Sequence, residues 1–232
     1  MVQTKELTGG RTSVDAIFNF LHEEILTLRL RPGDRISEAE IAARFNVSRQ
    51  PVRDAFSRLA NLELLKIRPK RATEVRRFSM REIKKSRFVR VAVETEVLRR
   101  ACIHCDTFGA ARLDEAIAAQ EKAAQTSDVD GFARLDYEFH QILCDIAKAE
   151  FAYDVIVAEK TKVDRLCVLG LEKEQQMPVL VQDHRKIAEA VKAHDAEVAM
   201  AAGLAHFSRL DDTIERIRTS NANYFEPQPS LP

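Results

Sequence analysis

The sequence predicts a mostly α-helical protein built from two domains. Glycine and proline are scarce, with seven of each among 232 residues, and few segments alternate apolar and polar residues as strands do. Apolar residues instead recur at spacings of three and four, which is typical of helices with one buried face. With 45% hydrophobic residues, the chain is long enough for two modest domains, each with its own core.

Three short helices are expected near the N-terminus. The segment 13–30 carries apolar residues along one helical face, at Val14, Ile17, Phe18, Leu21, Ile25 and Leu28. The sequence RPGD then ends this helix, and Ser37 is suited to cap a second helix over 38–45. NVSR turns tightly into a third helix that runs to about Leu62. Helices joined in this way form a helix-turn-helix.

A small β wing follows the third helix. Two short strands, 64–67 and 73–76, flank the basic turn RPKRA. Ser79 and Glu82 then have the spacing of a capping box, so a long helix begins at this point. The first domain, a winged helix-turn-helix, is therefore expected to cover residues 1–78.

The second domain is expected to be an all-α bundle of about six helices over residues 79–220. Residues 221–232 have the composition of a frayed, flexible tail. The predicted helices lie near residues 79–105, 108–126, 130–147, 151–169, 178–193 and 195–219.

The formal net charge of zero conceals an asymmetry between the two domains. Residues 1–78 carry 15 Lys and Arg against 10 Asp and Glu, which leaves 21 against 26 for the rest. A polyanionic partner is thus indicated for the first domain alone. No apolar run approaches the length of a membrane span, and the N-terminus lacks the apolar core of a signal peptide, so we expect a cytoplasmic protein.

The four cysteines indicate packing rather than chemistry. Cys102 and Cys105 form a C-x2-C motif, while Cys144 and Cys167 stand alone. A zinc knuckle needs a second C-x2-C, which this sequence lacks. We therefore interpret the four thiols as small buried side chains.

The residues that begin the third helix are suited to contact DNA. In a helix-turn-helix this helix enters the major groove with its N-terminal residues nearest the bases. Arg49 and Arg53 lie one turn apart, so one guanidinium is able to take a guanine edge while the other clamps a phosphate. A solvated charged face is the alternative, and the order of the surrounding elements favours DNA. The residues at this end of the helix are Ser48, Arg49, Gln50 and Arg53.

The first domain resembles the GntR family of bacterial transcription regulators. That family carries a pattern like PG-x-x-L-x-E-x-x-L-A-x-x-x-G-V-S-R-x-P-V-R-x-A, and Asn46 stands here in place of its glycine before VSR. The resemblance implies that Arg35, Arg49, Gln50 and Arg53 contact an operator and that Arg71 in the wing reaches the minor groove. The matching residues are Pro32, Gly33, Ile36, Glu38, Ile41, Ala42, Val47, Ser48, Arg49, Pro51, Val52, Arg53 and Ala55.

Three histidines and one aspartate in the second domain have the spacing of a metal site. Asp136 and His140 stand at i and i+4 on one helical face, where both can hold one metal. His184 precedes the turn between the last two helices by about as many residues as His206 follows it, so the two should lie level across the helix pair. For each histidine alone a surface or core role is the alternative. Three nitrogens and one oxygen suit Zn, Ni, Mn or Fe, of which we favour Zn.

The second domain resembles the FCD effector domain found in the FadR branch of GntR regulators. The resemblance covers roughly residues 79–218 and includes the segment DHRKIAEAVKAHDAE. It implies that Asp136, His140, His184 and His206 hold a divalent metal whose open positions accept a carboxylate effector. Arg90 falls where the family often has an arginine near the cavity.

We therefore predict a homodimeric, ligand-responsive transcription regulator, a repressor that binds an inverted-repeat operator and senses a small organic acid. Two alternatives remain open from the sequence. One is a metallohydrolase, since three histidines and a carboxylate are also able to activate water. The other is a DNA-binding regulator whose metal is purely structural.

Overall fold

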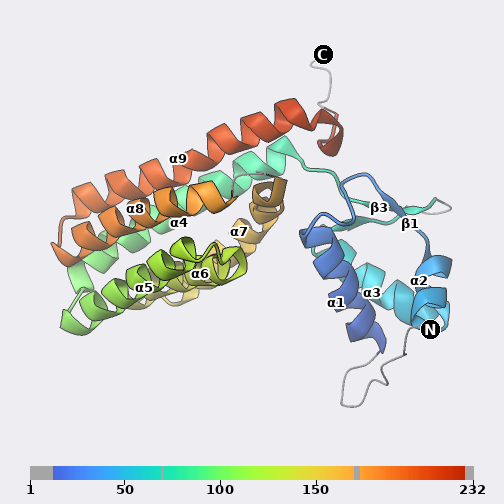
Figure 1. The fold of residues 1–232 in the computed structure, drawn as a ribbon, viewed down its shortest axis with the longest axis horizontal. Coiled ribbons are helices and arrows are strands. Elements are labelled where there is room, and N and C mark those ends of the chain that lie inside the picture. Colours follow the sequence, from blue (N-terminus) through green and yellow to red (C-terminus); the bar gives the residue numbers. More distant parts are fainter. Residues whose placement is uncertain (1–12, 69–70, 170–172, 228–232) are drawn as a thin grey trace. The chain divides into compact units, whose positions relative to one another are not determined.

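The chain folds into two compact units, each described below by itself (Figure 1). The structure is a computed structural model that describes residues 13–68, 71–169 and 173–227. One unit contains the residues up to Ser79 together with those from Asn221 onward, and the other runs from Met80 to Ser220. The fold is mostly helical, as the sequence predicts.

Three helices form the core of the first unit. They are α1 (Ser13–Leu26), α2 (Glu38–Phe45) and α3 (Arg49–Asn61), and α1 packs against α3. Burial follows the predicted face of α1, where Ile17, Leu21 and Ile25 are fully buried. The helix ends earlier than its apolar pattern because Leu28 adopts a left-handed backbone with φ of 59°.

The turn between α2 and α3 depends on Asn46. This residue takes a left-handed conformation, with φ of 52°, and its backbone N–H donates to carbonyls at the end of α2. Asparagine tolerates this conformation better than other residues except glycine. Asn46 therefore makes the same tight turn as the glycine found at this place in the pattern quoted above.

The wing is a three-stranded antiparallel sheet of order β1-β3-β2. The predicted strands appear as β2 (Leu65–Lys66) and β3 (Thr73–Val75), and the tip of the wing at residues 69–70 lies outside the described residues. A third strand, β1 (Arg35–Ile36), was not predicted, since two residues give no alternating pattern. It pairs with β3, and Gly33 donates its N–H to the carbonyl of Val75.

The C-terminal segment corrects the expectation of a frayed tail from residue 221. A 3-10 helix, η1 (Ala222–Tyr224), leads to Phe225, which is only 7% exposed. Phe78 donates its N–H to the carbonyl of Tyr224 and accepts from the N–H of Glu226, each at 2.8 Å. The tail is ordered as far as this pairing because Phe225 packs its ring against Phe78, with centroids 5.5 Å apart.

The second unit is a bundle whose six helices contact one another in a closed ring. In ring order the neighbours are α4, α7, α6, α5, α8 and α9, and α9 contacts α4 again. Figure 1 shows α4, α8 and α9 side by side along their lengths. The helices are α4 (Met80–His104), α5 (Thr107–Gln125), α6 (Val129–Ile146), α7 (Phe151–Leu169), α8 (Lys173–Lys192) and α9 (Ala196–Ser220).

Helix α8 starts earlier than predicted. Pro178 was interpreted as the first residue of the helix, whereas it lies inside a helix that begins at Lys173. A proline in this place costs the helix one N–H donor. The helix continues through it because Met177 and Val181, both nearly buried, belong to the core of the bundle.

The described cysteine side chains are packing residues. Cys102, Cys105 and Cys144 are buried and free. Burial raises the pKa of Cys102 to about 11 and that of Cys144 to about 12, so both stay protonated thiols near neutral pH.

Among the described helices, none has the length and apolar character needed to cross a membrane.

The pairing of Phe78 with Phe225 yields a first prediction. We expect Phe225→Ala to lower the free energy of unfolding of the full chain by about 3 kcal/mol, because it removes a buried aromatic ring. Urea denaturation followed by circular dichroism measures the change. Asn223→Ala is the matched control, since that side chain is exposed in the same segment. A change below about 0.5 kcal/mol for Phe225→Ala, as for ordinary surface sites, would contradict this account of the tail.

Candidate metal centre and nucleic-acid interface

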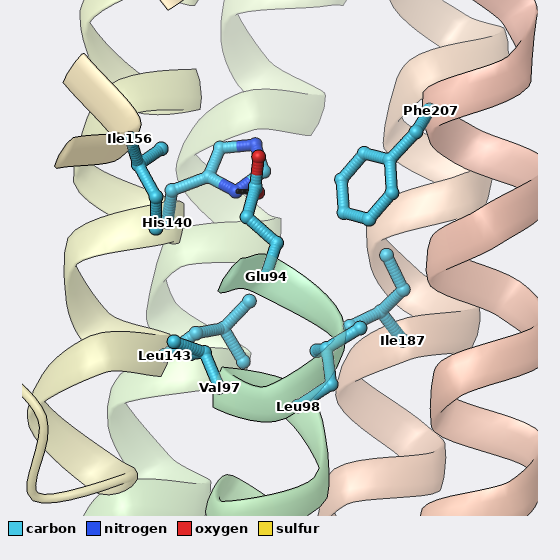
Figure 2. Close-up of a pocket in the computed structure, with 8 residues that line it drawn as sticks. All are labelled: Glu94, Val97, Leu98, His140, Leu143, Ile156, Ile187 and Phe207. Carbon is cyan, nitrogen blue, oxygen red and sulfur yellow. Dashed lines mark ion pairs between the residues drawn. The ribbon is translucent and has the colours of Figure 1, made fainter. Parts of the chain in front are cut away.

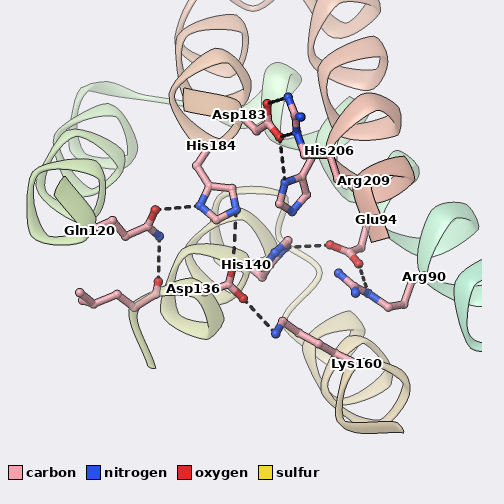
Figure 3. A network of polar contacts seen from close by, with 11 residues as sticks. Arg90, Glu94, Gln120, Asp136, His140, Lys160, Asp183, His184, His206 and Arg209 are labelled. Atoms are coloured by element: carbon pink, nitrogen blue, oxygen red, sulfur yellow. Dashed lines mark hydrogen bonds and ion pairs between the residues drawn. The ribbon is translucent and has the colours of Figure 1, made fainter. Parts of the chain in front are cut away.

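Besides Ser86, seven polar side chains are buried in the described part of the second unit, where apolar residues are the rule. None of the seven is more than 9% exposed. Buried polar groups are costly unless each finds a partner, so such a cluster needs a physical reason. Figure 3 shows how these groups converge between the helices. We call them the polar centre: Glu94, Gln120, Asp136, His140, Asp183, His184 and His206.

Three histidines from three helices meet in the polar centre. His140 comes from α6, His184 from α8 and His206 from α9. The ring centroids of His184 and His206 are 4.7 Å apart, which agrees with the level positions expected from their equal distance to the turn. One nitrogen from each ring lies within 4.8 Å of the others. Among the His, Cys, Asp and Glu side chains of the described residues, this trio is the group whose ligand atoms lie close enough together to hold one metal ion.

The ring nitrogens of the histidine trio fit a divalent metal. His140 Nε2 and His184 Nε2 are buried without a hydrogen-bond partner. Burial lowers the pKa of His184 well below its ordinary value, so this ring is in the neutral form that binds metals. Nitrogens bound to one zinc are about 3.3 Å apart in a tetrahedral site, so the trio needs only a small contraction to hold an ion.

Hydrogen bonds fix which nitrogen of His184 carries the proton. The amide nitrogen of Gln120 donates to the carbonyl of Leu135 at 3.0 Å, which turns the amide oxygen toward His184. That oxygen lies 2.7 Å from His184 Nδ1, so Nδ1 must donate. Nε2 is then left with a lone pair directed into the centre, which is the arrangement that metal-binding histidines use.

His140 is oriented by a carboxylate in the same way. Its Nδ1 lies 2.7 Å from Glu94 Oε2, and Arg90 donates from Nε to the other carboxylate oxygen at 2.7 Å. Burial alone would raise the pKa of Glu94, but His140 and Arg90 hold it at about 2. The carboxylate therefore accepts from His140 Nδ1 and leaves His140 Nε2 free to bind a metal.

His206 has a carboxylate neighbour at a longer distance. Its Nδ1 lies 3.7 Å from Asp183 Oδ2, which exceeds a hydrogen bond. Arg209 donates to both oxygens of Asp183, from Nη2 to Oδ1 at 2.9 Å. Although burial opposes ionisation, His206 and Arg209 hold the pKa of Asp183 well below its ordinary value.

Asp136, the fourth predicted ligand, lies at the edge of the trio rather than within it. Its Oδ1 is 3.5 Å from His184 Nε2, a separation that suits two ligands of one ion, but it does not join the tight group. Its Oδ2 is held 3.0 Å from the ammonium of Lys160 on α7. Burial alone would raise the pKa of Asp136, but Lys160 and the histidines hold it far below the ordinary value.

A small cavity adjoins the polar centre, as Figure 2 shows. Glu94 and His140 form one end of it, and the rest of its wall is apolar. It has room for about one water molecule. The apolar wall consists of Val97, Leu98, Leu143, Ile156, Ile187 and Phe207.

The sequence pattern found some of these residues and missed others. Arg90 was predicted near the cavity, and it lies beside the polar centre with its side chain 12% exposed. Gln120, Lys160 and Arg209 were not predicted. Gln120 and Lys160 carry no local signal, because each comes from a helix without a histidine ligand. Asp183 was missed although it directly precedes His184 in the sequence DHRK.

The predicted nucleic-acid contacts are all exposed on the first unit. Arg49, Gln50 and Arg53 lie in the first turns of α3, and Arg35 lies on β1. Ser48 precedes α3 as its N-cap residue, without a hydrogen bond from its side chain. The remaining residue, Arg71, is exposed in the wing.

Two of these side chains have a hydrogen-bond partner within the protein and still remain exposed to solvent. Arg53 donates to Glu38 of α2 at 2.9 Å, and Gln50 donates to Asp54 at 2.9 Å. Exposed ion pairs of this kind contribute little stability, so both side chains can exchange these partners for others. For Arg49 no ion pair is seen among the described residues.

Comparison with known families finds matches that cover both units. A profile described as "Bacterial regulatory proteins, gntR family" matches residues 14–75, and one described as "FCD domain" matches residues 87–209. The chain is 32% identical over 212 residues to the HTH-type transcriptional repressor RspR of Escherichia coli, a match that covers 91% of this chain and 93% of that protein. It is 24% identical over 217 residues to the HTH-type transcriptional regulator LutR of Bacillus subtilis, covering 85% and 95%.

Solved structures share the fold. Escherichia coli McbR/YncC matches with a TM-score of 0.66 at 17% identity, over 91% of this chain and 99% of that one. A GntR transcriptional regulator from Rhodococcus sp. RHA1 matches with a TM-score of 0.67 at 20% identity, over 87% and 97%. At these identities the likeness concerns the arrangement of helices and strands.

The hydrogen bond between Gln120 and His184 yields a second prediction. We expect Gln120→Ala to weaken zinc binding about 10–100-fold, because it removes the acceptor that orients His184. Competition with a chromophoric chelator measures the affinity. Gln125→Ala is the control, since Gln125 is exposed on the same helix. Equal zinc affinity in Gln120→Ala and the unmodified protein would show that Gln120 does not orient His184 for metal binding.

Proposed function

This chain belongs to the GntR family of bacterial regulatory proteins and carries an FCD domain, and we propose that it is a dimeric repressor controlled by a small organic acid. Membership of this family makes it a transcription regulator and not an enzyme, which removes the metallohydrolase alternative. The proposal assigns DNA binding to residues 1–78 and metal and effector binding to residues 79–220. The protein is proposed to act in the cytoplasm, where operator DNA is found.

The observation that carries the proposal is the histidine trio in the polar centre. One ring nitrogen from each histidine lies within 4.8 Å of the others inside a bundle, and His140 Nε2 and His184 Nε2 are buried without a hydrogen-bond partner. A purely helical support for DNA-binding units needs no such group. We propose that His140, His184 and His206, with Asp136 beside them, hold a divalent transition metal, Zn before Ni, Mn or Fe.

The effector is proposed to bind at the metal. A divalent metal is a Lewis acid. When it has more than four coordination positions, those that the protein ligands leave open can accept a carboxylate. Arg90 supports this assignment, because its guanidinium lies beside Glu94 and His140 and is nearly buried. The proposed role of Arg90 is to favour an anion at this side of the polar centre.

DNA binding is proposed for α3 and the wing. Arg49 and Arg53, one turn apart at the start of α3, are suited to a guanine edge and a phosphate, with Ser48 and Gln50 beside them. Arg35 and Arg71 are proposed to contact the backbone and the minor groove. A symmetric dimer would present two such helices to an inverted repeat.

Effector and operator are linked by a coupling free energy. If the acid binds one arrangement of the dimer better than another, operator affinity changes by the same coupling, typically about 1–3 kcal/mol. We propose that the acid releases the DNA. The remaining alternative is a regulator whose metal is purely structural, and the experiment on acids and chelation below separates the two.

Removal of Arg49 tests the DNA interface. We expect Arg49→Ala to weaken operator binding by about 1–3 kcal/mol and to relax the preference for one base, since a guanidinium at this position reads a base edge. Fluorescence anisotropy on a selected operator and its single-base variants, at one salt concentration, measures both effects. Arg99→Ala is the control, because Arg99 is an exposed arginine of α4 paired with Glu96. Unchanged binding by Arg49→Ala would remove Arg49 from the proposed interface.

Thermal melting tests the effector site. We expect at least one small organic acid to raise the melting temperature of the zinc-loaded protein, by about 2.7 kcal/mol of stability at 100 times its Kd, and to lose this effect after chelation. His184→Ala should lose zinc and the response to the acid together. His104→Ala is the control, because His104 lies at the end of α4, away from the trio.

Two results would count against the proposed function. Full zinc retention in His184→Ala would overturn the ligand set. A lower melting temperature after chelation, with no shift from any acid, would establish a structural metal instead.

A further inference from the structure

The charged side chains in and around the polar centre cancel in pairs. Glu94 pairs with Arg90, Asp136 with Lys160, and Asp183 with Arg209. Each of the three carboxylates therefore already has a cationic side chain as its partner.

A divalent metal would disturb this balance. Metal-bound histidines are neutral, so the ion would add two positive charges to a site whose three carboxylates already have cationic partners. Uncompensated charge in a buried site is costly, and a bound anion is the simplest way to remove the cost. A monocarboxylate offsets half of the charge, whereas a dianion offsets all of it.

Two nearly buried cations lie on adjacent helices at this site. Arg90 on α4 has its side chain 12% exposed and lies over the ring of Phe207, with 5.6 Å from the guanidinium carbon to the ring centroid. Lys160 on α7 has its side chain 13% exposed and lies 4.0 Å above the ring of Tyr137. Figure 3 shows both reaching toward the carboxylates that flank the histidines. Each is held by an aromatic face and a carboxylate, so both positions are fixed before any ligand binds.

The places of the two cations bear on the class of anion. Arg90 lies at Glu94 and Lys160 at Asp136, so the two mark separate places for anionic groups. A compact dianion such as phosphate carries its charge at one place. Two carboxylates joined by a short hydrocarbon chain combine two charges with an apolar link.

From these observations we propose that the effector is a short dicarboxylate, with one carboxylate at the metal and the second held by Lys160. This inference rests on the proposed function, because it names the class of acid that the same site binds. Lys160 would exchange part of its contact with Asp136 for the second carboxylate of the ligand. Arg90 and Glu94 would remain beside the first carboxylate.

Matched pairs of acids test the inference on the zinc-loaded full-length protein. Isothermal titration calorimetry compares malonate with propionate, succinate with butyrate, and glutarate with valerate, so that each pair has the same number of carbons. We expect at least one diacid to bind about tenfold or more tightly than its monoacid partner, since it gains a second charged contact. Chelation of the zinc should abolish the binding of both members of the pair.

Variants of Lys160 test the assigned second contact. Lys160→Met should bring the affinity for the diacid down to about that for the monoacid, while Lys160→Arg should keep most of the difference. Zinc supplied in excess keeps the site loaded in both variants, and zinc content measured by atomic emission verifies this before each titration. Lys162→Met is the control, since Lys162 is a neighbouring lysine of α7 paired with Glu159.

The outcomes separate this inference from the proposed function. Equal affinity for diacids and monoacids in the unmodified protein would overturn the dicarboxylate assignment and leave the metal-dependent acid sensor standing. An undiminished preference for the diacid in Lys160→Met would overturn the role of Lys160. If no acid of either class binds the zinc-loaded protein, both the inference and the sensor fail.

Discussion

The bundle of this protein is organised around the need to pair every charged and polar group that it buries. All six helices of the second unit contribute to this pairing: α4 through Glu94, α5 through Gln120, α6 through His140, α7 through Lys160, α8 through His184 and α9 through His206. A half-satisfied polar network is worse than an apolar core, because each unpaired group retains its desolvation cost. A shift of any one helix would break at least one of these contacts, so the network restricts how the helices pack.

Within the polar centre, the same hydrogen bonds give some atoms a partner and leave others without one. Gln120 and Glu94 each occupy the Nδ1 side of a histidine, and this leaves the opposite nitrogen without a partner. The unpaired atoms are therefore a product of the arrangement rather than a packing fault. Since each carboxylate of the polar centre already has a cationic partner, the proposed ion would serve to satisfy histidine nitrogens rather than to cancel a charge.

Local spacing made part of this site predictable, and the rest depends on tertiary structure. Asp136 and His140 are recognisable because residues four apart share a helical face, and His184 and His206 because they are equidistant from one turn. Gln120 and Lys160 come from two further helices and join the site only once the ring of helices has closed. Lys160 also draws Asp136 away from the trio, which no spacing rule would indicate. In the first unit, Asn46 kept the turn of the quoted pattern, whereas β1 was missed because it is two residues long.

The pairing of Phe78 with Phe225 means that the chain passes between its two units twice. It enters the bundle through α4, which carries Arg90 and Glu94, and leaves through α9, which carries His206, before returning to the strand next to its starting point. Both passages thus begin from one piece of paired backbone, held by the hydrogen bonds between Phe78 and residues 224 and 226. Loss of this pairing would release the start of α4 and the end of α9 together, and these two helices carry Arg90, Glu94 and His206.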